Sequence, residues 1–325
     1  MKSKIIIGIA FIAMLLLPIS AQFTSAQGDQ IGVEEKPDSI TITTEYITFR
    51  FTEGKPNFTW WNGNKSSSDE IYNVHYTKLS EYFGSDDILD GPSELVGISY
   101  NLLTSDWSTD ILEEDDEVTI TMSLNGLANG AELQFIVHIY TTEQVISGTD
   151  STVQGLTEIK FDIVVKNWQF SVGAQGLAIK AQIQESQRRH RVRIRNGADE
   201  AIGNRSRIMN FESDAYNDNV VAYYEWTTFA DIYDGATKVD TIDVDVVYFN
   251  DEIPGPGEGP IGEQEIYNQW LTYPNYGDSL TLVHDPLIGV NPDAVTESVA
   301  LSILPIIGGL LAPVLVVSLV RRKKH

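Results

Sequence analysis

The chain has 325 residues, no cysteine and a formal net charge of -24, because 46 Asp and Glu residues outnumber 22 Lys and Arg residues. So acidic a protein repels nucleic acid, which argues against a nucleic-acid partner. The absence of cysteine excludes a disulfide-stapled scaffold and thiolate metal sites.

The N-terminus predicts a secretory signal peptide over residues 1–26. Lys2 and Lys4 precede an apolar stretch of 13 residues (5–17), and small residues follow, with cleavage expected after Ala26. An uncleaved anchor is the alternative. The apolar stretch is too short for a stable spanning helix, so we expect the mature chain to begin outside the cell.

The C-terminus predicts a membrane anchor. Residues 298–320 contain no charged side chain over 23 positions, which suffices to cross a hydrocarbon core of about 30 Å. The basic tail 321–325 follows at once and is expected to stay in the cytoplasm, and residues 291–297 form a short stalk. The predicted localisation is the cell membrane, with the ectodomain extracellular and the C-terminal helix as the membrane contact.

This layout resembles that of uncharacterised archaeal surface-anchored proteins. The shared features are the signal peptide, an acidic β-rich ectodomain without cysteine, the sequons, one C-terminal transmembrane anchor and a basic stub. The resemblance covers the whole chain but rests on architecture, and it implies a place in the cell envelope without implying any chemistry.

Between the two ends, apolar and polar residues alternate with a period of two, which is typical of antiparallel strands with one buried face. Turn-forming sequences such as NGLANG and SGTDS separate the alternating segments. The clearest strands are expected at 118–124, 133–139, 159–165, 177–183 and 242–246, and further strands at 40–51, 70–78, 205–212, 219–230, 265–273 and 279–284.

The predicted fold is therefore an all-β ectodomain, either one large or two tandem antiparallel β-sandwiches, plus the C-terminal transmembrane helix. If there are two units, we place the first sandwich at 27–186 and the second at 187–290. The alternative is that the second range continues the first as one unit.

Seven of the ten arginines lie between residues 188 and 207. In a strand, alternate residues share a face, so Val192 and Ile194 would enter the core and the arginines between them would face outward. One interpretation is a register-fixing ladder against Asp243 and Asp245 on a neighbouring strand. The other is an anion-binding or partner-docking face for surface glycans or a second copy of the chain. The residues in question are Arg191, Arg193, Arg195, Arg205 and Arg207.

Two acidic segments predict calcium, the one cofactor that the sequence suggests, because hard cations take clustered carboxylate oxygens from loops. Solvated acidic loops are the alternative. The candidate ligands are Asp86, Asp87 and Asp90 in the first segment and Glu212, Asp214 and Asp218 in the second. Three sequons, at Asn57, Asn64 and Asn204, would be exposed to glycosylation by the predicted topology.

No catalytic motif is present: the chain has no HExxH, no GxSxG and no glycine-rich phosphate loop. We therefore expect a non-catalytic cell-surface structural or adhesive protein. The alternative is an extracellular carbohydrate-binding or carbohydrate-processing domain. Exposure of Trp60, Trp61 and Trp226 separates the two, because sugars stack on exposed aromatic rings whereas buried indoles belong to the core.

Overall fold

The computed structural model describes residues 31–63, 71–145, 152–185, 190–196, 206–213, 219–248 and 266–292. These residues form antiparallel sheets and two short 3-10 turns, η2 (Pro92–Glu94) and η3 (Ala128–Gly130). The predicted all-β class is confirmed for these residues. No helix within the described ranges is long and apolar enough to cross a membrane, and the predicted signal peptide 1–26, anchor 298–320 and tail 321–325 lie outside them.

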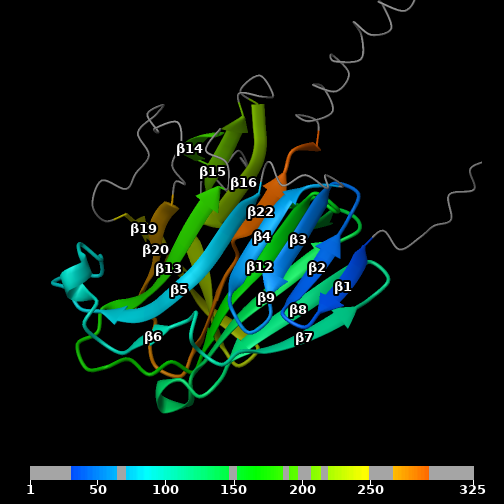
Figure 1. Ribbon diagram of the computed structural model, residues 1–325. Helices are drawn as coiled ribbons and strands as arrows, with labels where there is room; N and C mark the ends of the chain where they lie inside the picture. The colour runs from blue at the N-terminus through cyan, green and yellow to red at the C-terminus, as the bar shows by residue number, and fades with distance from the viewer. Residues whose placement is uncertain are drawn as a thin grey trace, which may run out of the picture. The chain divides into compact units, whose positions relative to one another are not determined.

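Sheet A carries the N-terminal strands (Figure 1). Its strand order is β1-β2-β3-β4-β5-β13-β20-β19, and β6 pairs separately with β5. Its strands are β1 (Gly32–Lys36), β2 (Ser39–Thr43), β3 (Ile47–Thr52), β4 (Asn57–Asn62), β5 (Tyr72–Tyr82), β6 (Ser99–Asn101), β13 (Gly176–Glu185), β19 (Asp245–Val247) and β20 (Ile266–Pro274).

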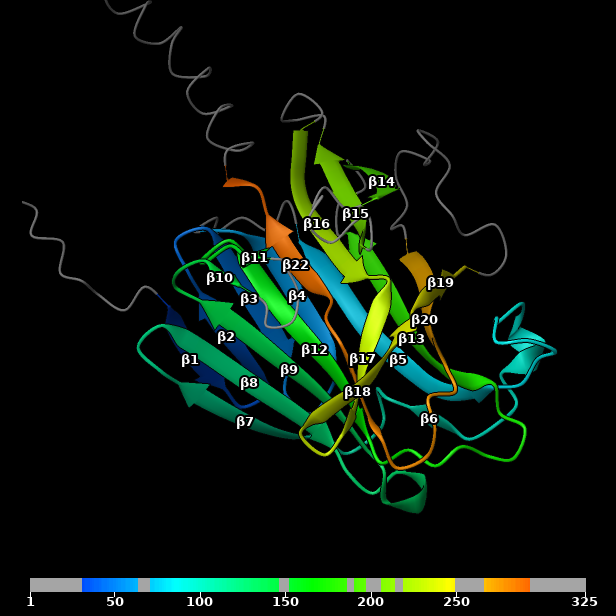
Figure 2. The ribbon, with the colours of Figure 1, turned by 180° about the vertical axis from the view of Figure 1, so that it is seen from behind.

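Sheet B lies behind sheet A and faces the viewer in Figure 2. Strands β7, β8, β9 and β12 pair in that order. Its strands are β7 (Ser108–Glu113), β8 (Glu117–Leu124), β9 (Glu132–Tyr140), β12 (Glu158–Lys166), β14 (His190–Asn196), β15 (Ser206–Ser213), β16 (Asn219–Thr227), β17 (Phe229–Asp234), β18 (Thr237–Asp243), β21 (Thr281–His284) and β22 (Leu287–Val290). A separate small hairpin joins β10 (Gln144–Val145) to β11 (Thr152–Val153).

Sheet B branches beyond β12. One half of that strand pairs with β22, which continues through β16 and β15 to β14, and the other half pairs with β21, which continues through β17 to β18. The branch exists because Asp285 and Pro286 interrupt the chain between β21 and β22. Proline has no N–H for a sheet ladder, so a strand that reaches it must break or end.

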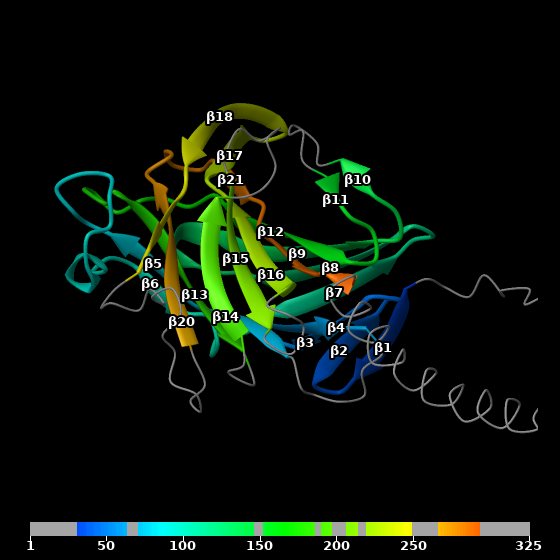
Figure 3. The same ribbon diagram turned by 90° about the horizontal axis from the view of Figure 1, so that it is seen from above.

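The two sheets pack face to face around one continuous hydrophobic core, and Figure 3 shows them as two layers. Alternate residues of each strand point inward, as the period-two pattern requires. Aromatic rings join the layers: the ring centroids of Phe58 and Phe161 are 5.0 Å apart, and those of Tyr76 and Phe135 are 4.5 Å apart.

Strands from both sides of residue 186 share both sheets. β13 pairs with β20 in sheet A, and β12 pairs with β21 and β22 in sheet B. The described residues between 31 and 292 accordingly group as one compact unit. The two predicted ranges, 27–186 and 187–290, therefore each contribute described strands to both sheets.

The predicted strand at 242–246 is wrong in one respect. β18 ends at Asp243 in sheet B and β19 begins at Asp245 in sheet A, so the chain changes sheet at Val244, which is buried. Strands that cross between layers form corners of this kind. The alternation of apolar and polar residues continues through the corner, and therefore does not mark it.

Candidate functional site

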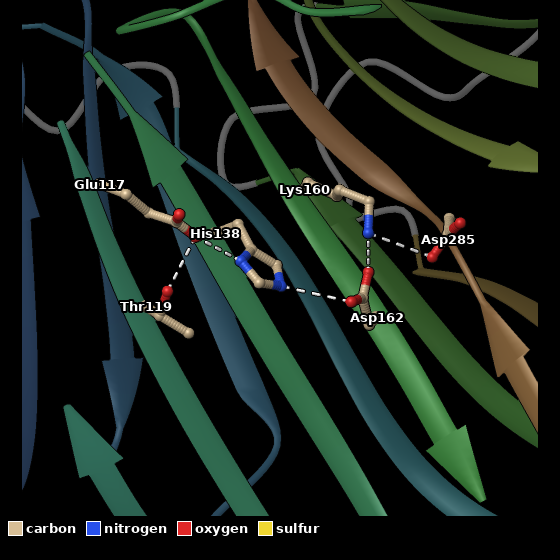
Figure 4. A network of polar contacts seen from close by, with 6 residues as sticks. All are labelled: Glu117, Thr119, His138, Lys160, Asp162 and Asp285. Atoms are coloured by element: carbon tan, nitrogen blue, oxygen red, sulfur yellow. Dashed lines mark hydrogen bonds and ion pairs between the residues drawn. The ribbon is translucent and has the colours of Figure 1, made fainter. Parts of the chain in front are cut away.

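A network of ionisable side chains lies on the outer face of sheet B, where β8, β9 and β12 run side by side (Figure 4). The register places Thr119, His138 and Lys160 opposite one another on the three strands. His138 is held on both sides: its Nδ1 lies 2.6 Å from Glu117 Oε1, and its Nε2 lies 3.2 Å from Asp162 Oδ2.

Lys160 joins this histidine cluster to the branch point of the sheet. Its Nζ donates to Asp162 Oδ1, and also to Asp285 Oδ1 at 3.2 Å. Asp285 is positioned by the interruption between β21 and β22, where the backbone N–H of Phe161 donates to the carbonyl oxygen of Pro286 at 2.8 Å. The charges therefore meet where the two arms of sheet B separate.

The protonation of these groups follows from burial and from their charged neighbours. Burial raises the pKa of Asp285 to about 7, and the nearby carboxylate of Asp162 acts in the same direction while Lys160 opposes it. Burial is the largest single influence on Asp162 and His138 and disfavours their charged forms, but the hydrogen bond between them and their other charged and hydrogen-bonding neighbours together outweigh it. The pKa of Asp162 is therefore lowered and that of His138 is raised. Two carboxyl groups that share one lysine thus differ strongly in pKa.

The charged groups of this network are paired with one another. Both ring nitrogens of His138 and the ammonium of Lys160 have carboxylate partners, and the Lys160 side chain is 11% exposed. Partly buried charges require such partners, because an unpaired charge removed from water is costly. We call the cluster of Glu117, His138, Lys160, Asp162 and Asp285 the brace, because its ion pairs connect β8, β9 and β12 to the segment between β21 and β22.

A second polar region lies on the outer face of sheet A and has a different character. Here β2, β3, β4, β5 and β13 form a depression of about 390 Å³. Among the described residues its lining is mostly neutral, and Asp38 is the one acid in it, in a protein that contains 46. The lining residues are Asp38, Ser39, Arg50, Thr52, Asn57, Thr59, Asn73, His75 and Gln184.

The hydrogen-bonding groups of this depression are only partly engaged with one another. Thr59 Oγ1 donates to Asn73 Oδ1 at 2.7 Å, whereas Asn57 Oδ1 is buried without a hydrogen-bond partner among the described residues. The guanidinium of Arg50 lies 5.7 Å from the ring centre of half-buried Trp61. Burial lowers the pKa of His75, so its imidazole is neutral near pH 7 and can both donate and accept.

The predicted arginine ladder lies on β14, at one end of the sheet B path. β14 pairs with β15, so its partner strand carries Glu212 opposite Arg191 and Asn210 opposite Arg193. Of the two interpretations, the ladder against Asp243 and Asp245 is therefore wrong, since Asp243 lies on β18 beside β17 and Asp245 lies on β19 beside β20. Arg205, and the side chains of Arg191, Arg193, Arg195 and Arg207, lie outside the described part of the chain.

The calcium candidates lie in two different settings. Asp86, Asp87 and Asp90 belong to one loop, where Asp86 Oδ1 accepts from the backbone N–H of Ile88 at 3.1 Å. Glu212 is buried within β15, and Asp214 and Asp218 lie outside the described residues. Within the described ranges, no three His, Asp or Glu side chains gather in a way that could hold a metal ion.

The described sheets place the three tryptophan candidates and one of the three glycosylation candidates. Trp60 and Trp226 are buried in the core, and only Trp61 of the three is half-buried. Asn57 lines the depression of sheet A, while Asn64 and Asn204 lie outside the described residues.

Sequence reasoning did not identify His138, Lys160, Asp162 and Asp285 as a cluster, nor Arg50, Asn73 and His75. The signal for the first three was available in part, because they occupy polar-face positions of two predicted strands. Their meeting depends on strand order, and so does the contact of Lys160 with Asp285.

Comparisons with known proteins leave the chain without a family. No family model matches it, and no curated protein is similar in sequence. Among solved structures, the crystal structure of a proposed mutarotase, YeaD, from Salmonella typhimurium aligns with 87% of this chain and 100% of its own, with a TM-score of 0.36 and 10% identity. A likeness of that size does not establish a shared fold or function.

Proposed function

We propose that this chain is a non-catalytic, membrane-anchored surface protein that binds a neutral, hydroxyl-rich carbohydrate on the outer face of sheet A. The observation that carries the proposal is the depression of about 390 Å³, lined by side-chain amides, hydroxyls, one imidazole and one guanidinium beside Trp61.

The chemistry of the lining matches that of a sugar. Hydroxyl groups both donate and accept hydrogen bonds, and the amides of Asn57 and Asn73 and the neutral imidazole of His75 do the same. The face of an aromatic ring such as Trp61 packs against the apolar C–H surface of a sugar ring. Because Asp38 is the one acid among the described lining residues, the lining favours a neutral ligand over a cation.

Binding sites of this class are concave and hold a few convergent polar groups, and volumes of about 300–1,000 Å³ are typical. Trp60 and Trp226 are buried in the core and count against a broad aromatic platform, so of the three indoles the proposed site uses Trp61 alone. The placement at the cell surface rests on the sequence features of residues 1–26 and 298–320. A calcium ion at 212–218 and a partner for the arginines of β14 stay predictions.

The test measures binding of neutral oligosaccharides to the full chain by calorimetry, in a detergent without a sugar head group. The chain is made in bacteria, because a glycan on Asn57 would occupy the same depression. We expect Trp61→Ala and Asn73→Ala to weaken binding at least about ten-fold, since each removes a group that would contact the ligand.

Gln134→Ala is the matched control, because Gln134 lies on the outer face of sheet B. It should leave the affinity unchanged. If no neutral oligosaccharide binds, or if the sheet A variants bind as well as the unaltered chain, the proposal is wrong.

A second candidate function, carbohydrate processing, is favoured by one observation. Asp162 and Asp285 share Lys160 yet have pKa values displaced in opposite directions, a combination that suits a base and an acid in glycoside hydrolysis. The measurement is release of reducing ends from oligosaccharides. Hydrolysis that disappears in Asp285→Asn would support this candidate, and its absence in the unaltered chain would leave the binding function alone.

A further inference from the structure

Two lysines meet on the outer face of sheet A, beyond the depression. Lys180 on β13 lies directly opposite Lys78 on β5 and opposite Trp270 on β20, three strands that lie side by side in Figure 1. The Nζ atom of each lysine lies 5.9 Å from the ring centre of Trp270. Both lysines are half-buried, so two ammonium groups converge on one indole ring. We call Lys78 and Lys180 the lysine pair.

The lysine pair has no carboxylate partner within the described part of the chain, whereas four other lysines do. Those four are Lys36, Lys160, Lys166 and Lys238. Asp245 on β19, the strand next to β20, is in register with Thr272 rather than with Trp270. Like charges directly opposite one another destabilise a sheet, so the pair lacks an anion that would neutralise it.

Groups that can bind hydroxyls connect the lysine pair to the depression. Alternate residues of a strand share a face, so Lys180, Gln182 and Gln184 follow one another along β13, and Gln184 lines the depression. Gln182 Nε2 donates to Asn268 Oδ1 at 2.8 Å, which leaves Gln182 Oε1 and Asn268 Nδ2 without partners among the described residues. The pair and the depression are therefore about 13 Å apart along the strand and belong to one polar surface.

The charge of the whole protein restricts what the pair can hold. A net charge of -24 repels a free anion, so an anion is retained here only if the rest of its molecule makes further contacts. The amides of Gln182 and Asn268 supply such contacts to a hydroxyl-rich molecule. A carboxylate suits the pair, because its two oxygens can each accept a charge-assisted hydrogen bond from one ammonium.

We propose that the lysine pair binds the carboxylate of an acidic sugar, in an oligosaccharide whose uncharged units occupy the depression. The inference rests on the proposed function, to which it adds an acidic unit and a direction of the sugar chain along β13. Trp270 holds the two ammonium groups near each other before the ligand arrives, since the face of an indole attracts cations.

The experiment compares trisaccharides that carry one glucuronic, galacturonic or mannuronic acid unit, each beside its uncharged methyl ester. Binding to the full chain, made in bacteria and held in a detergent without a sugar head group, is measured by calorimetry. We expect at least one acid to bind about ten-fold or more tightly than its ester, because the ester retains the hydroxyls and loses the charge. In the double variant Lys78→Met, Lys180→Met the acid should bind no more tightly than the ester.

The matched control is the double variant Lys166→Met, Lys238→Met, which removes two cations from sheet B and gives the same net charge. Its preference for the acid over the ester should equal that of the unaltered chain. Thermal unfolding checks that both double variants fold. Loss of the lysine pair should not lower the unfolding temperature, because it removes the repulsion between two like charges.

The single variants Lys78→Gln and Lys180→Gln should each lower the preference for the acid in part, and they keep the test valid if the double variant does not fold. The inference is wrong if no acid binds, if acids and esters bind equally, or if the variants of the pair keep the full preference. Failure of the proposed function appears differently, as absent binding of the esters and of neutral oligosaccharides and an affinity that Trp61→Ala does not change.

Discussion

The phenol ring of Tyr223 on β16 lies over Gly289 on β22, and through this gap its hydroxyl reaches Glu158 on β12. A glycine in the interior of a sheet leaves room for such a neighbouring aromatic ring. The contact joins three adjacent strands of sheet B on the arm that carries β14, β15 and β16.

We expect Gly289→Ala to destabilise the protein by about 1–3 kcal/mol, the usual cost of forcing an extra carbon into a packed site. A Cβ at this position would overlap the ring of Tyr223. Chemical denaturation measures the loss. In a Tyr223→Ala background the same substitution should cost much less, and Gly91→Ala, where a Cβ meets no other atom closer than 3.8 Å, serves as control.

Lys160→Met should lower the free energy of unfolding by about 2 kcal/mol, because it leaves Asp285 and Asp162 partly buried without their shared cation. The matched control is Lys166→Met on the same strand, whose ion pair with Glu132 at 3.5 Å is more exposed. That pair should contribute no more than about 1 kcal/mol. Equal losses in the two variants would show that the brace at the branch point adds no stability.

The contribution of Asp285 to the free energy of unfolding should fall as pH rises towards neutrality. Because burial raises its pKa from 3.8 to about 7, the folded state binds this proton more tightly than the unfolded state. The resulting stabilisation is complete below 3.8 and is lost as pH rises through about 7. Asp162 and His138 belong to the same cluster. The lowered pKa of Asp162 affects the free energy of unfolding only in solution more acidic than its ordinary pKa of 3.8.

Unfolding titrations of the unaltered chain and of Asp285→Asn across this range measure the effect as a difference between the two. We expect the free energy of unfolding of the unaltered chain, relative to that of Asp285→Asn, to fall as pH rises from 3.8 to about 7. Asp110→Asn, which alters an exposed carboxyl of β7, should give a difference that is flat over the same interval.

Trp60→Ala and Trp61→Ala should have opposite consequences, although the two residues are adjacent. Trp60 is fully buried, and its truncation should cost about 3–5 kcal/mol of stability. Trp61 lies on the outer face, so Trp61→Ala should cost about 1 kcal/mol or less and act instead on carbohydrate affinity. Thermal unfolding and calorimetric binding of both variants distinguish stability from affinity.

Local structure was predictable from the sequence wherever one strand has one buried face. The alternation at 118–124, 133–139, 159–165 and 177–183 corresponds to β8, β9, β12 and β13. The same alternation at 242–246 hides a change of sheet at Val244, because both sheets bury the same side of the chain. Periodicity reports which side chains are buried, but not which layer they are buried in.

Strand neighbours were not predictable in the same way. The arginine strand β14 pairs with the next strand along the chain, β15, rather than with the acidic segment to which charge complementarity pointed. The brace has a similar origin, since Lys160 meets Asp285 only because β21 and β22 both lie against β12. No local pattern encodes contacts between residues so far apart.

The position of the last described strands has a consequence for how the chain folds. β20 lies between β13 and β19, β21 between β12 and β17, and β22 between β12 and β16, so each occupies an interior place in a sheet. Pairings between distant segments form slowly, because the loop entropy is lost before the contacts are gained. Sheet A cannot close until residue 274 is available, and sheet B cannot close until residue 290 is. A chain translocated from its N-terminus would thus cross the membrane unfolded and complete its sandwich at the end of export.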